Sequence, residues 1–393
     1  MVAYRRWGLM RMIKKISESF NESLVLLMAL GLALPMSGWL LIILYQSSFS
    51  ATDFALDETT VTVIERVDNR NIHCSTIDDL SYCLDDFEKF QSQMPLTVIL
   101  GNSQLHAINQ YTVGEKNAVA LLHSMALERD RYVIGLSYPN MNFLQKLVAI
   151  EYLAREVKVD QLVIPLVFDD TRELGLGTDF RVAFDDEEFR RSFSNTPFGA
   201  SILERFYNPV GGDDNVAEDM DGLQGSVQGA VETFLNEVVA SRSALWAARA
   251  ELRSTIFGNL YLLRNWIFDI SASSVRRKIP GTYRLNMTAL DQIIESATSQ
   301  GIEVIVYIAP IRSDVSIPYD AEEYEIFKAE ALSICKAHGC FGTSLEGLVP
   351  NQSWGLKEST SFQDEGEVDF MHFQFEGHIL LANAITRLIF GEN

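Results

Sequence analysis

The chain has 393 residues, of which 47% are hydrophobic and 22% are charged. This length and composition can bury the core of one large domain or two ordinary ones, and they exclude a disordered chain, a collagen and a small disulfide scaffold. The 32 basic and 53 acidic residues give a formal net charge of −21. Because nucleic acids are bound through clusters of Lys and Arg, this charge argues against a nucleic-acid partner.

The N-terminal region has the pattern of a membrane anchor. Residues 23–52 contain no charged side chain, and residues 24–45 are apolar enough to span about 30 Å of hydrocarbon. Basic residues dominate the segment before this stretch and acidic residues follow it. The positive-inside rule therefore predicts a cytoplasmic N-terminus at residues 1–22, a transmembrane anchor at 23–46 and an extracytoplasmic remainder at the plasma (inner) membrane.

A cleaved signal peptide is the alternative interpretation of this apolar stretch. Signal peptides usually have an apolar region of roughly 7 to 15 residues that ends at a site of the A-x-A type. The stretch at residues 24–45 is longer, and no such site follows it. These differences favour an uncleaved single-pass anchor.

The four cysteines fall into two close pairs, Cys74 with Cys83 and Cys335 with Cys340. In an oxidising compartment such pairs predict two structural disulfides with short loops. A metal site is the alternative, but neither pair has the C-x-x-C spacing and only one histidine lies close to each. Cys335 also fits a buried thiol, because it falls in the apolar phase of a helical pattern.

The rest of the chain alternates between short apolar runs and amphipathic patterns. A linker and lead-in segment is expected at residues 47–92. Strands are predicted at residues 96–100, 132–136, 161–168 and 303–309, and helices at 142–157, 290–299 and 321–337. Continuous apolar strands alternating with helices are typical of a parallel sheet covered on both faces. We therefore predict a three-layer α/β/α sandwich for residues 93–393.

More than a hundred residues separate the third and fourth predicted strands, which is too long for a simple crossover. We expect an insertion at about residues 175–275. Its first part, residues 179–222, is rich in acidic residues and glycine, which predicts mobile surface loops. Its second part, residues 227–270, repeats apolar residues at helical spacing, which predicts a helical pair or cap.

Ligands of open α/β sheets bind beyond the carboxyl ends of the strands, so the residues that follow each strand are the first functional candidates. Ser103 lies in the sequence Gly-Asn-Ser-Gln directly after the first strand. A serine in a sharp turn between strand and helix presents its hydroxyl to substrate, as a nucleophile requires. The alternative is that Ser103 only caps the following helix.

A second candidate group lies near the C-terminus, where Asp369 and His372 precede the last amphipathic helix. An Asp three residues before a His in a tight loop can fix the tautomer and orientation of the imidazole. The other ring nitrogen is then free to accept a proton from a serine. The alternative is that Asp369 or His372 caps the last helix.

GNS after the first strand and DFMHFQFEGH before the last helix together resemble the two ends of the SGNH/GDSL hydrolase superfamily. The resemblance implies a flavodoxin-like α/β/α sandwich with Ser103 as nucleophile, Asp369 as orienting residue and His372 as general base. With its N-terminal anchor, the arrangement is similar to the D-alanine transfer protein and to alginate O-acetylation proteins. Those proteins work outside the membrane beside a membrane-bound O-acyltransferase.

The sequence departs from the family pattern, because the usual GDS is GNS and no G-x-N-D follows the third strand. The resemblance implies an oxyanion hole made by the serine N–H, a glycine N–H and an asparagine side chain. Asn140 and Asn142, after the second strand, are the candidate donors. Asp169 and Arg172 after the third strand, and Arg312 after the fourth, are candidates for substrate binding or are solvated loop charges.

Two other histidines are interpreted as structural. His106 lies three residues after Ser103 and is expected to be a partly exposed helix residue rather than a catalytic group. His378 is expected to cap or pack the final helix. The glycine-rich GLQGSVQG follows no predicted strand and lacks the lysine of a P-loop, so it does not predict a phosphate site.

The sequence thus predicts a membrane-anchored extracytoplasmic serine esterase or O-acyltransferase that acts on cell-envelope or exported polysaccharide through an acyl-serine intermediate. The expected partners are an acylated envelope glycan or other ester substrate, a membrane-bound O-acyltransferase and the membrane, without nucleic acid. No metal or organic cofactor is expected. The alternative is a catalytically degenerate binding or scaffold protein, which the altered GNS and the missing G-x-N-D would explain.

Overall fold

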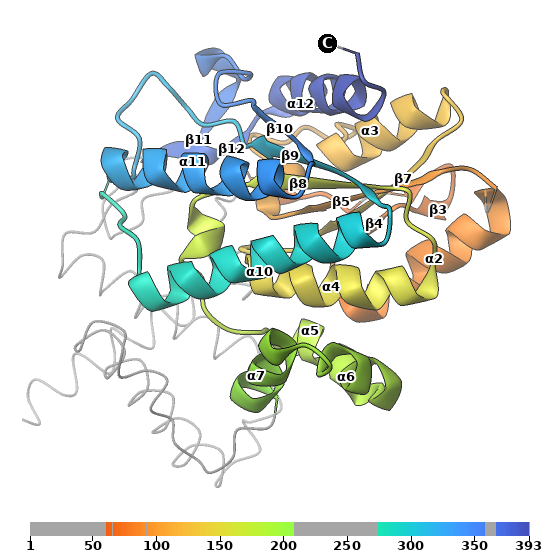
Figure 1. Cartoon of the computed structure of the whole chain (residues 1–393). Coiled ribbons are helices and arrows are strands. Elements are labelled where there is room, and N and C mark those ends of the chain that lie inside the picture. Colours follow the sequence, from red (N-terminus) through yellow and green to blue (C-terminus); the bar gives the residue numbers. More distant parts are fainter. Residues whose placement is uncertain (1–59, 65, 92, 208–273, 358–366, 393) are drawn as a thin grey trace, which may run out of the picture. The chain divides into compact units, whose positions relative to one another are not determined.

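The computed structural model (Figure 1) describes residues 60–64, 66–91, 93–207, 274–357 and 367–392, which belong to one compact unit. The anchor expected at residues 23–46 and the helical pair expected at 227–270 lie outside the described residues. In the described ranges, no helix combines the length and the apolar character needed to cross a bilayer.

A six-stranded sheet lies at the centre, in the order β10-β9-β8-β5-β7-β4, with all neighbouring strands parallel. The strands are β4 (His73–Cys74), β5 (Leu96–Gly101), β7 (Tyr132–Ser137), β8 (Gln161–Leu166), β9 (Glu303–Ile308) and β10 (Phe341–Ser344). Because β5, β7 and β8 are buried along their whole length, both faces of the sheet must be covered. The four predicted strands are confirmed, with boundaries within two residues.

Helices cover both faces of this sheet, as predicted (Figure 1). The helices are α2 (Ile77–Gln91), α3 (Ala118–Leu127), α4 (Phe143–Glu156), α10 (Pro280–Ser299), α11 (Ala321–Ala337) and α12 (Phe375–Ile389). On one face α3 packs beside α12, and on the other α4 packs beside α10, with α2 next to them. α11 runs along the edge strand β10. The described unit is therefore a three-layer α/β/α arrangement.

Side-chain caps fix where the predicted helices begin. Asn142 precedes α4 and forms a capping box with Gln145, and Asp320 accepts the Glu323 N–H at the start of α11. The helices predicted at 142–157 and 321–337 are confirmed, whereas the pattern at 290–299 is only the second half of α10.

The segment expected to be a linker is folded where the structure describes it, so that expectation is wrong for residues 60–64 and 66–91. The short strands are β1 (Val61–Thr62), β2 (Arg66–Val67) and β3 (Arg70–Asn71), followed by β4 and α2. β2 and β3 form a hairpin whose two turn residues, Asp68 and Asn69, have positive φ. β4 completes the main sheet beside β7. Strands of two residues leave too short a pattern to be read from the sequence.

The acidic segment at 179–222 is not a mobile loop in its described part. Residues 178–206 form α5 (Thr178–Arg181), η4 (Val182–Asp185), α6 (Glu187–Phe193) and α7 (Pro197–Phe206). The phenylalanines Phe180, Phe184 and Phe189 are buried, and Phe184 stacks on Phe189. Aromatic residues spaced along helices supply this core, while the acidic residues face outward. Residues 208–222 lie outside the described ranges.

Both expected disulfides are present. Cys74 in β4 bonds to Cys83 in α2, and Cys335 in α11 bonds to Cys340 just before β10. The described cysteines include no free thiol. The alternatives of a metal site and of a buried thiol at Cys335 are therefore wrong.

Candidate active site

The nucleophile turn begins where β5 ends at Gly101. Ser103 opens a short 3-10 helix, η2 (Ser103–Leu105), that folds back over the end of the strand. A Cβ on Gly101 would lie 2.3 Å from the Leu105 side chain, so any other residue here would force that buried side chain to move. The residue that caps the turn is Asn102, whose Oδ1 accepts the Gln104 N–H at 3.0 Å. Ser103 itself is therefore not the cap.

Ser103 meets His372 and Asp369 in one hydrogen-bonded relay. The distance from Ser103 Oγ to His372 Nε2 is 2.8 Å, and that from His372 Nδ1 to Asp369 Oδ2 is 2.9 Å. The three side chains are 3–8% exposed. Residues more than 260 positions apart thus form the serine, histidine and aspartate arrangement used for nucleophilic catalysis.

The histidine and aspartate lie in a strand rather than in the expected tight loop. This strand, β12 (Glu367–Phe373), pairs antiparallel with β11 (Trp354–Lys357). In a regular strand, residues three apart point to opposite faces. Here Asp369 Oδ1 accepts the N–H groups of Met371 at 2.8 Å and His372 at 2.9 Å. This local turn brings the two side chains together.

Asp369 is held in the charged form. Burial by itself would raise its pKa, but His372 and the two backbone N–H groups lower the pKa to about 2. The ionised carboxylate accepts the Nδ1–H of His372, which leaves Nε2 as the acceptor of the Ser103 hydroxyl proton. The arrangement therefore favours proton transfer from Ser103 to His372.

Asn109 supports the carboxylate from behind. Its Nδ2 donates to Asp369 Oδ2 at 3.2 Å. Gly355 packs against this amide, and a Cβ there would lie 1.8 Å from Asn109 Oδ1. Arg312 Nη1 donates to the Gly355 carbonyl at 2.8 Å, and the rest of its guanidinium pairs with Asp314. Arg312, a predicted substrate ligand, is thus engaged in supporting the site.

A charged anchor holds the nucleophile turn on the α4 side. Asn102 Nδ2 donates to Asp170 Oδ1 at 2.8 Å, and Asp170 Oδ2 pairs with Lys146 of α4. The Lys146 and Asp170 side chains are 0% and 2% exposed. Burial raises the pKa of Asp170, and its contacts with Lys146 and Asn102 oppose that rise. This ion pair was not predicted from the sequence.

Gln104 fastens the two distant parts of the site to each other. Its Nε2 donates to the Met371 carbonyl at 3.1 Å and to the Pro310 carbonyl at 3.0 Å. The nucleophile turn, the histidine strand and the end of β9 therefore share one buried amide.

The two asparagines predicted to be oxyanion donors have other contacts. Asn142 Oδ1 accepts the Gln145 N–H at 2.9 Å, and its Nδ2 donates to two carbonyl groups, the nearer being Gly175 at 3.0 Å. Asn140 is exposed and has a φ of 54° in the turn after Pro139. Within the described part of the chain, neither side chain hydrogen-bonds to the triad.

Asp169 and Arg172 bond to each other at 3.3 Å beyond β8. Asp169 also pairs with Arg276 and accepts from the Tyr319 hydroxyl at 3.1 Å, while Arg172 Nε donates to the Arg277 carbonyl at 2.8 Å. These contacts fasten two later segments of the chain to the end of β8. Their role in this structure is to join segments.

His106 and His378 are both buried, so the expectation of a partly exposed His106 is wrong. His106 ends the nucleophile turn rather than lying on a helix. His378 packs within α12 as expected. Its Nδ1 accepts the Ala118 N–H at 3.1 Å and its Nε2 donates to the Ala107 carbonyl at 3.1 Å. Across the described residues, no three His, Cys, Asp or Glu side chains are grouped to hold a metal.

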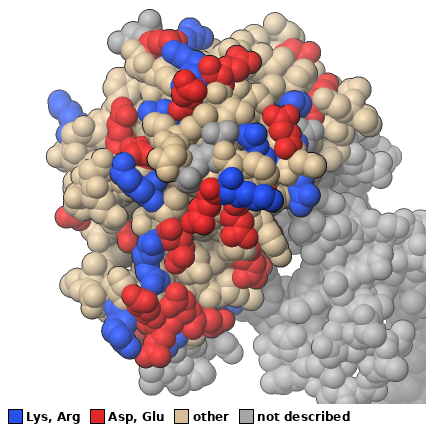
Figure 2. All heavy atoms as spheres, turned by 90° about the vertical axis from the view of Figure 1, so that its right-hand side faces the viewer, with Lys and Arg blue, Asp and Glu red and all other residues tan. Residues whose placement is uncertain are grey.

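The opposite end of the sheet, where the strands begin, is a mixed-charge surface (Figure 2). Lys and Arg are interspersed there with Asp and Glu. Among the residues just before β7 and β8, Arg129 pairs with Glu392 and Lys158 pairs with Asp160. A cavity of about 390 Å³ at this end is lined by residues 154–160 and 300–302. Because the triad lies at the carboxyl ends of the strands, this cavity is not its substrate site.

The chain matches no known family profile and no curated protein sequence. Among solved structures it is similar to a GDSL-like lipase from Parabacteroides merdae, with a TM-score of 0.37 and 8% identity over 77% of this chain and 98% of that one. It is also similar to an α/β hydrolase from the metagenome of Lake Arreo, with a TM-score of 0.36 and 10% identity over 77% and 98%. A variant of an acetyl-xylooligosaccharide esterase from Geobacillus gives a TM-score of 0.34 and 10% identity over 76% and 94%. These TM-scores are too low to assign a fold family or an activity to this chain.

Proposed function

We propose that this protein is a serine-dependent ester hydrolase or O-acyltransferase that works through an acyl-serine intermediate. The observation that carries the proposal is the unbroken relay from Ser103 Oγ through His372 to Asp369, with distances of 2.8 Å and 2.9 Å. Such a relay activates an otherwise weak nucleophile, because the imidazole takes the hydroxyl proton as the oxygen attacks.

In the first half of the reaction, Ser103 Oγ attacks the acyl carbonyl carbon and its proton passes to His372 Nε2. Asp369 stabilises the imidazolium, which then protonates the leaving alcohol as the ester bond breaks. In the second half, water or a sugar hydroxyl gives its proton to His372 and attacks the acyl-serine. Return of that proton to Ser103 Oγ releases the acid or the new ester and restores the site.

The N–H of Ser103 is the proposed first oxyanion donor. Ser103 is the first residue of η2, and its N–H makes none of the hydrogen bonds of that turn. A single oxyanion donor is typically worth about 2.7 to 4 kcal/mol of transition-state stabilisation. The Asn140 and Asn142 side chains are engaged elsewhere or exposed, so any second donor must come from another group.

The test is covalent labelling by a serine-reactive fluorophosphonate. The wild-type chain should be labelled, and Ser103→Ala should abolish labelling because the attacking oxygen is gone. His372→Ala should slow labelling by a factor of about 10³ or more. Ser81→Ala, which removes an exposed serine from α2, is the matched control and should label like the wild type. Equal labelling of wild type and Ser103→Ala would refute the proposal.

We further propose that the reaction takes place outside the plasma membrane on acylated envelope or exported polysaccharide, beside a membrane-bound O-acyltransferase. Two disulfides in the described residues support an oxidising compartment. The apolar stretch at residues 24–45 supports a tether that keeps the site near such substrates. Acetylated oligosaccharides added to the full-length protein in membranes should lose acetate or pass it to an added glycan in a Ser103-dependent manner.

A binding or scaffold role is the second candidate, and it is favoured by the engagement of Asn142 in helix capping. A scaffold would retain glycan or acyltransferase binding in Ser103→Ala and would show no labelling of Ser103 in the wild type. The labelling experiment therefore separates the two candidates.

A further inference from the structure

A second chain of buried polar side chains lies behind the nucleophile turn. His73 Nε2 and His106 Nδ1 each lie 2.7 Å from Ser137 Oγ. These side chains are 0–4% exposed. A hydroxyl has one hydrogen, so it donates to one imidazole and accepts from the other. One ring therefore presents an N–H to the hydroxyl and the other a bare nitrogen, which requires both rings to carry their hydrogen on the same atom, Nδ1 in both or Nε2 in both.

This chain ends on the turn that carries the nucleophile. His106 closes η2, and its N–H donates to the Ser103 carbonyl at 3.1 Å. Ser137 is the last residue of β7, the strand next to β5. The His106 side chain thus ties the far end of the turn to a neighbouring strand, while Asn102 ties its near end to Asp170.

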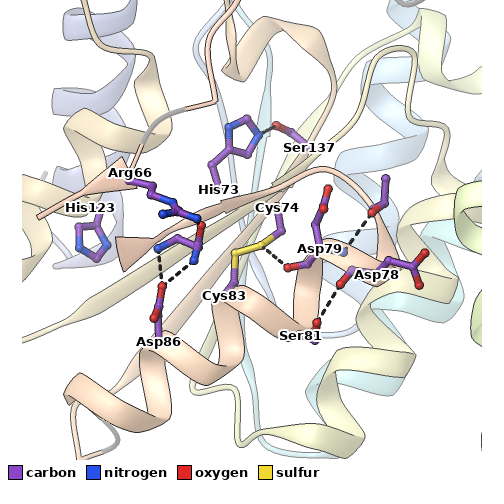
Figure 3. The surroundings of a disulfide bond; sticks show 12 residues. Arg66, His73, Cys74, Asp78, Asp79, Ser81, Cys83, Asp86, His123 and Ser137 are labelled. Carbon is purple, nitrogen blue, oxygen red and sulfur yellow. Dashed lines mark hydrogen bonds between the residues drawn. A yellow bond between two sulfur atoms is a disulfide. The ribbon is translucent and has the colours of Figure 1, made fainter. Parts of the chain in front are cut away.

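The other end of the chain lies on β4, which has only two residues and forms the edge of the sheet. Cys74, the neighbour of His73, is bonded to Cys83 of α2 (Figure 3). α2 is also tied to this region through Asp86, which accepts from the backbone and side chain of Asn71 at 2.7 Å. The disulfide therefore holds a strand that is too short to be held firmly by its own ladder.

Both imidazoles are suited to a neutral, shared hydrogen bond. Burial lowers the pKa of His73 to about 4, against weaker opposing contributions from backbone hydrogen bonds. Burial also lowers the pKa of His106 well below its usual value, and the nearby His73, His372 and His378 lower it further. A neutral His106 adds no positive charge beside His372 when that residue takes the serine proton.

We propose that His106, Ser137 and His73 are positioning residues for the nucleophile Ser103, and that the Cys74–Cys83 disulfide keeps them in register. This inference rests on the proposed function. The reactivity of Ser103 then depends on a covalent bond between the edge strand β4 and α2, although that bond need not touch the triad.

The test uses amide replacements that keep or move one hydrogen-bonding atom. The amide of asparagine lies near the position of histidine Nδ1, and that of glutamine near Nε2. His106→Asn and His73→Gln keep a polar atom facing Ser137, whereas His106→Gln and His73→Asn displace it. The second-order rate of fluorophosphonate labelling should stay within about threefold of wild type in the first pair and fall about 10- to 100-fold in the second.

The role of the Cys74–Cys83 disulfide is tested by removing each of the two disulfides in turn. Cys74→Ala with Cys83→Ala should slow labelling about 10-fold or more. Cys335→Ala with Cys340→Ala removes the other short-range disulfide, with a sequence separation of 5 against 9, beside β10 at the opposite edge of the sheet, and should leave the rate unchanged. Rates are compared for the folded fraction of each variant, measured by circular dichroism, so that a loss of stability alone does not count.

The outcomes separate this inference from the proposed function. No labelling of the wild type at Ser103 would overturn both. The positioning role alone would be overturned if the wild type is labelled normally while the asparagine and glutamine variants at each histidine are labelled at equal rates. Equal slowing by the two disulfide variants would show that loss of Cys74–Cys83 acts only through general stability, which would overturn its part in the proposal.

Discussion

Two polar networks flank the nucleophile turn, and they differ in charge. On one side Asn102 bonds to Asp170, which pairs with Lys146. On the other side His106 bonds to Ser137, which bonds to His73. Both networks are buried, and both fasten a turn of a few residues to neighbouring elements of the fold.

The difference between them predicts how each one fails. A buried ion pair is weak evidence of net stabilisation, but removal of one partner leaves a buried charge without compensation. A neutral network contains no such charge. It loses stability in acid, because its histidines bind a proton once the chain is unfolded and so favour the unfolded state. The charged side should therefore govern stability at neutral pH, and the neutral side should govern it at acidic pH.

The largest effect is expected from breaking the charged side. Lys146→Met should lower the free energy of unfolding by about 3 to 5 kcal/mol, because Asp170 would lose its partner in the core. Urea denaturation at pH 7.5 measures the change. Adding Asp170→Asn to this variant should restore part of the loss, and Lys158→Met, at a lysine that is 87% exposed, should change little. A double variant less stable than Lys146→Met would contradict the ion-pair interpretation.

Acidification should break the neutral side. Burial lowers the pKa of His73 to about 4 and that of His106 well below its usual value. Below about pH 6.5 the unfolded chain binds protons on these histidines and the folded chain does not, so the free energy of unfolding should fall as pH falls. The loss should reach about 3 kcal/mol by pH 4 for His73 alone.

Urea denaturation at pH 7.5, 6 and 4.5 measures this dependence, and His73→Gln should flatten it. Asp369, whose pKa is lowered to about 2, acts in a lower range, because its contribution is lost only below the usual pKa of an unfolded Asp, about 3.9. Stability that is constant from pH 7.5 to 4.5 would show that the buried histidines are not neutral in the folded chain.

The smallest effect is expected where the charged side meets the turn. Asn102→Ala removes the hydrogen bond to the charged Asp170 as well as the side-chain cap on the Gln104 N–H, so it should lower the free energy of unfolding by about 2 kcal/mol. Asn102→Asp has nearly the same shape but places a second carboxylate beside Asp170, so it should be more destabilising than Asn102→Ala. The reverse order would argue that Asp170 is protonated.

Much of the fold can be predicted from local sequence patterns. The four predicted strands are buried apolar runs, and α4 and α11 begin at side-chain caps that can be read from the sequence. Ser103 and the Asp369–His372 pair were identifiable because their positions beside a strand and before a helix imply a shared edge of the sheet. The sequence predicts that these two segments lie close together, but the hydrogen-bond distances between them come only from the structure.

Other parts could not be derived, because they depend on tertiary contacts. β4 has only two residues and is defined by its pairing with β7. In residues 178–206 the many acidic residues hide the apolar pattern of the phenylalanines, so the helices there were not predicted. Asn142 fitted both an oxyanion donor and a helix cap, and only its contacts distinguish the two. One signal was available and missed. Lys146 lies in the apolar phase of a helical pattern, which indicates a buried partner such as Asp170.

The proposed mechanism requires that Ser103, His372 and Asp369 act as one unit. The most direct measurement compares ester hydrolysis by Ser103→Ala, His372→Ala and the double variant. When residues act as a unit, removing one of them already abolishes their joint contribution to the rate. The double variant should therefore be no slower than the slower single variant. Losses that multiply, with the double variant slower by the product of the two single effects, would contradict the claim.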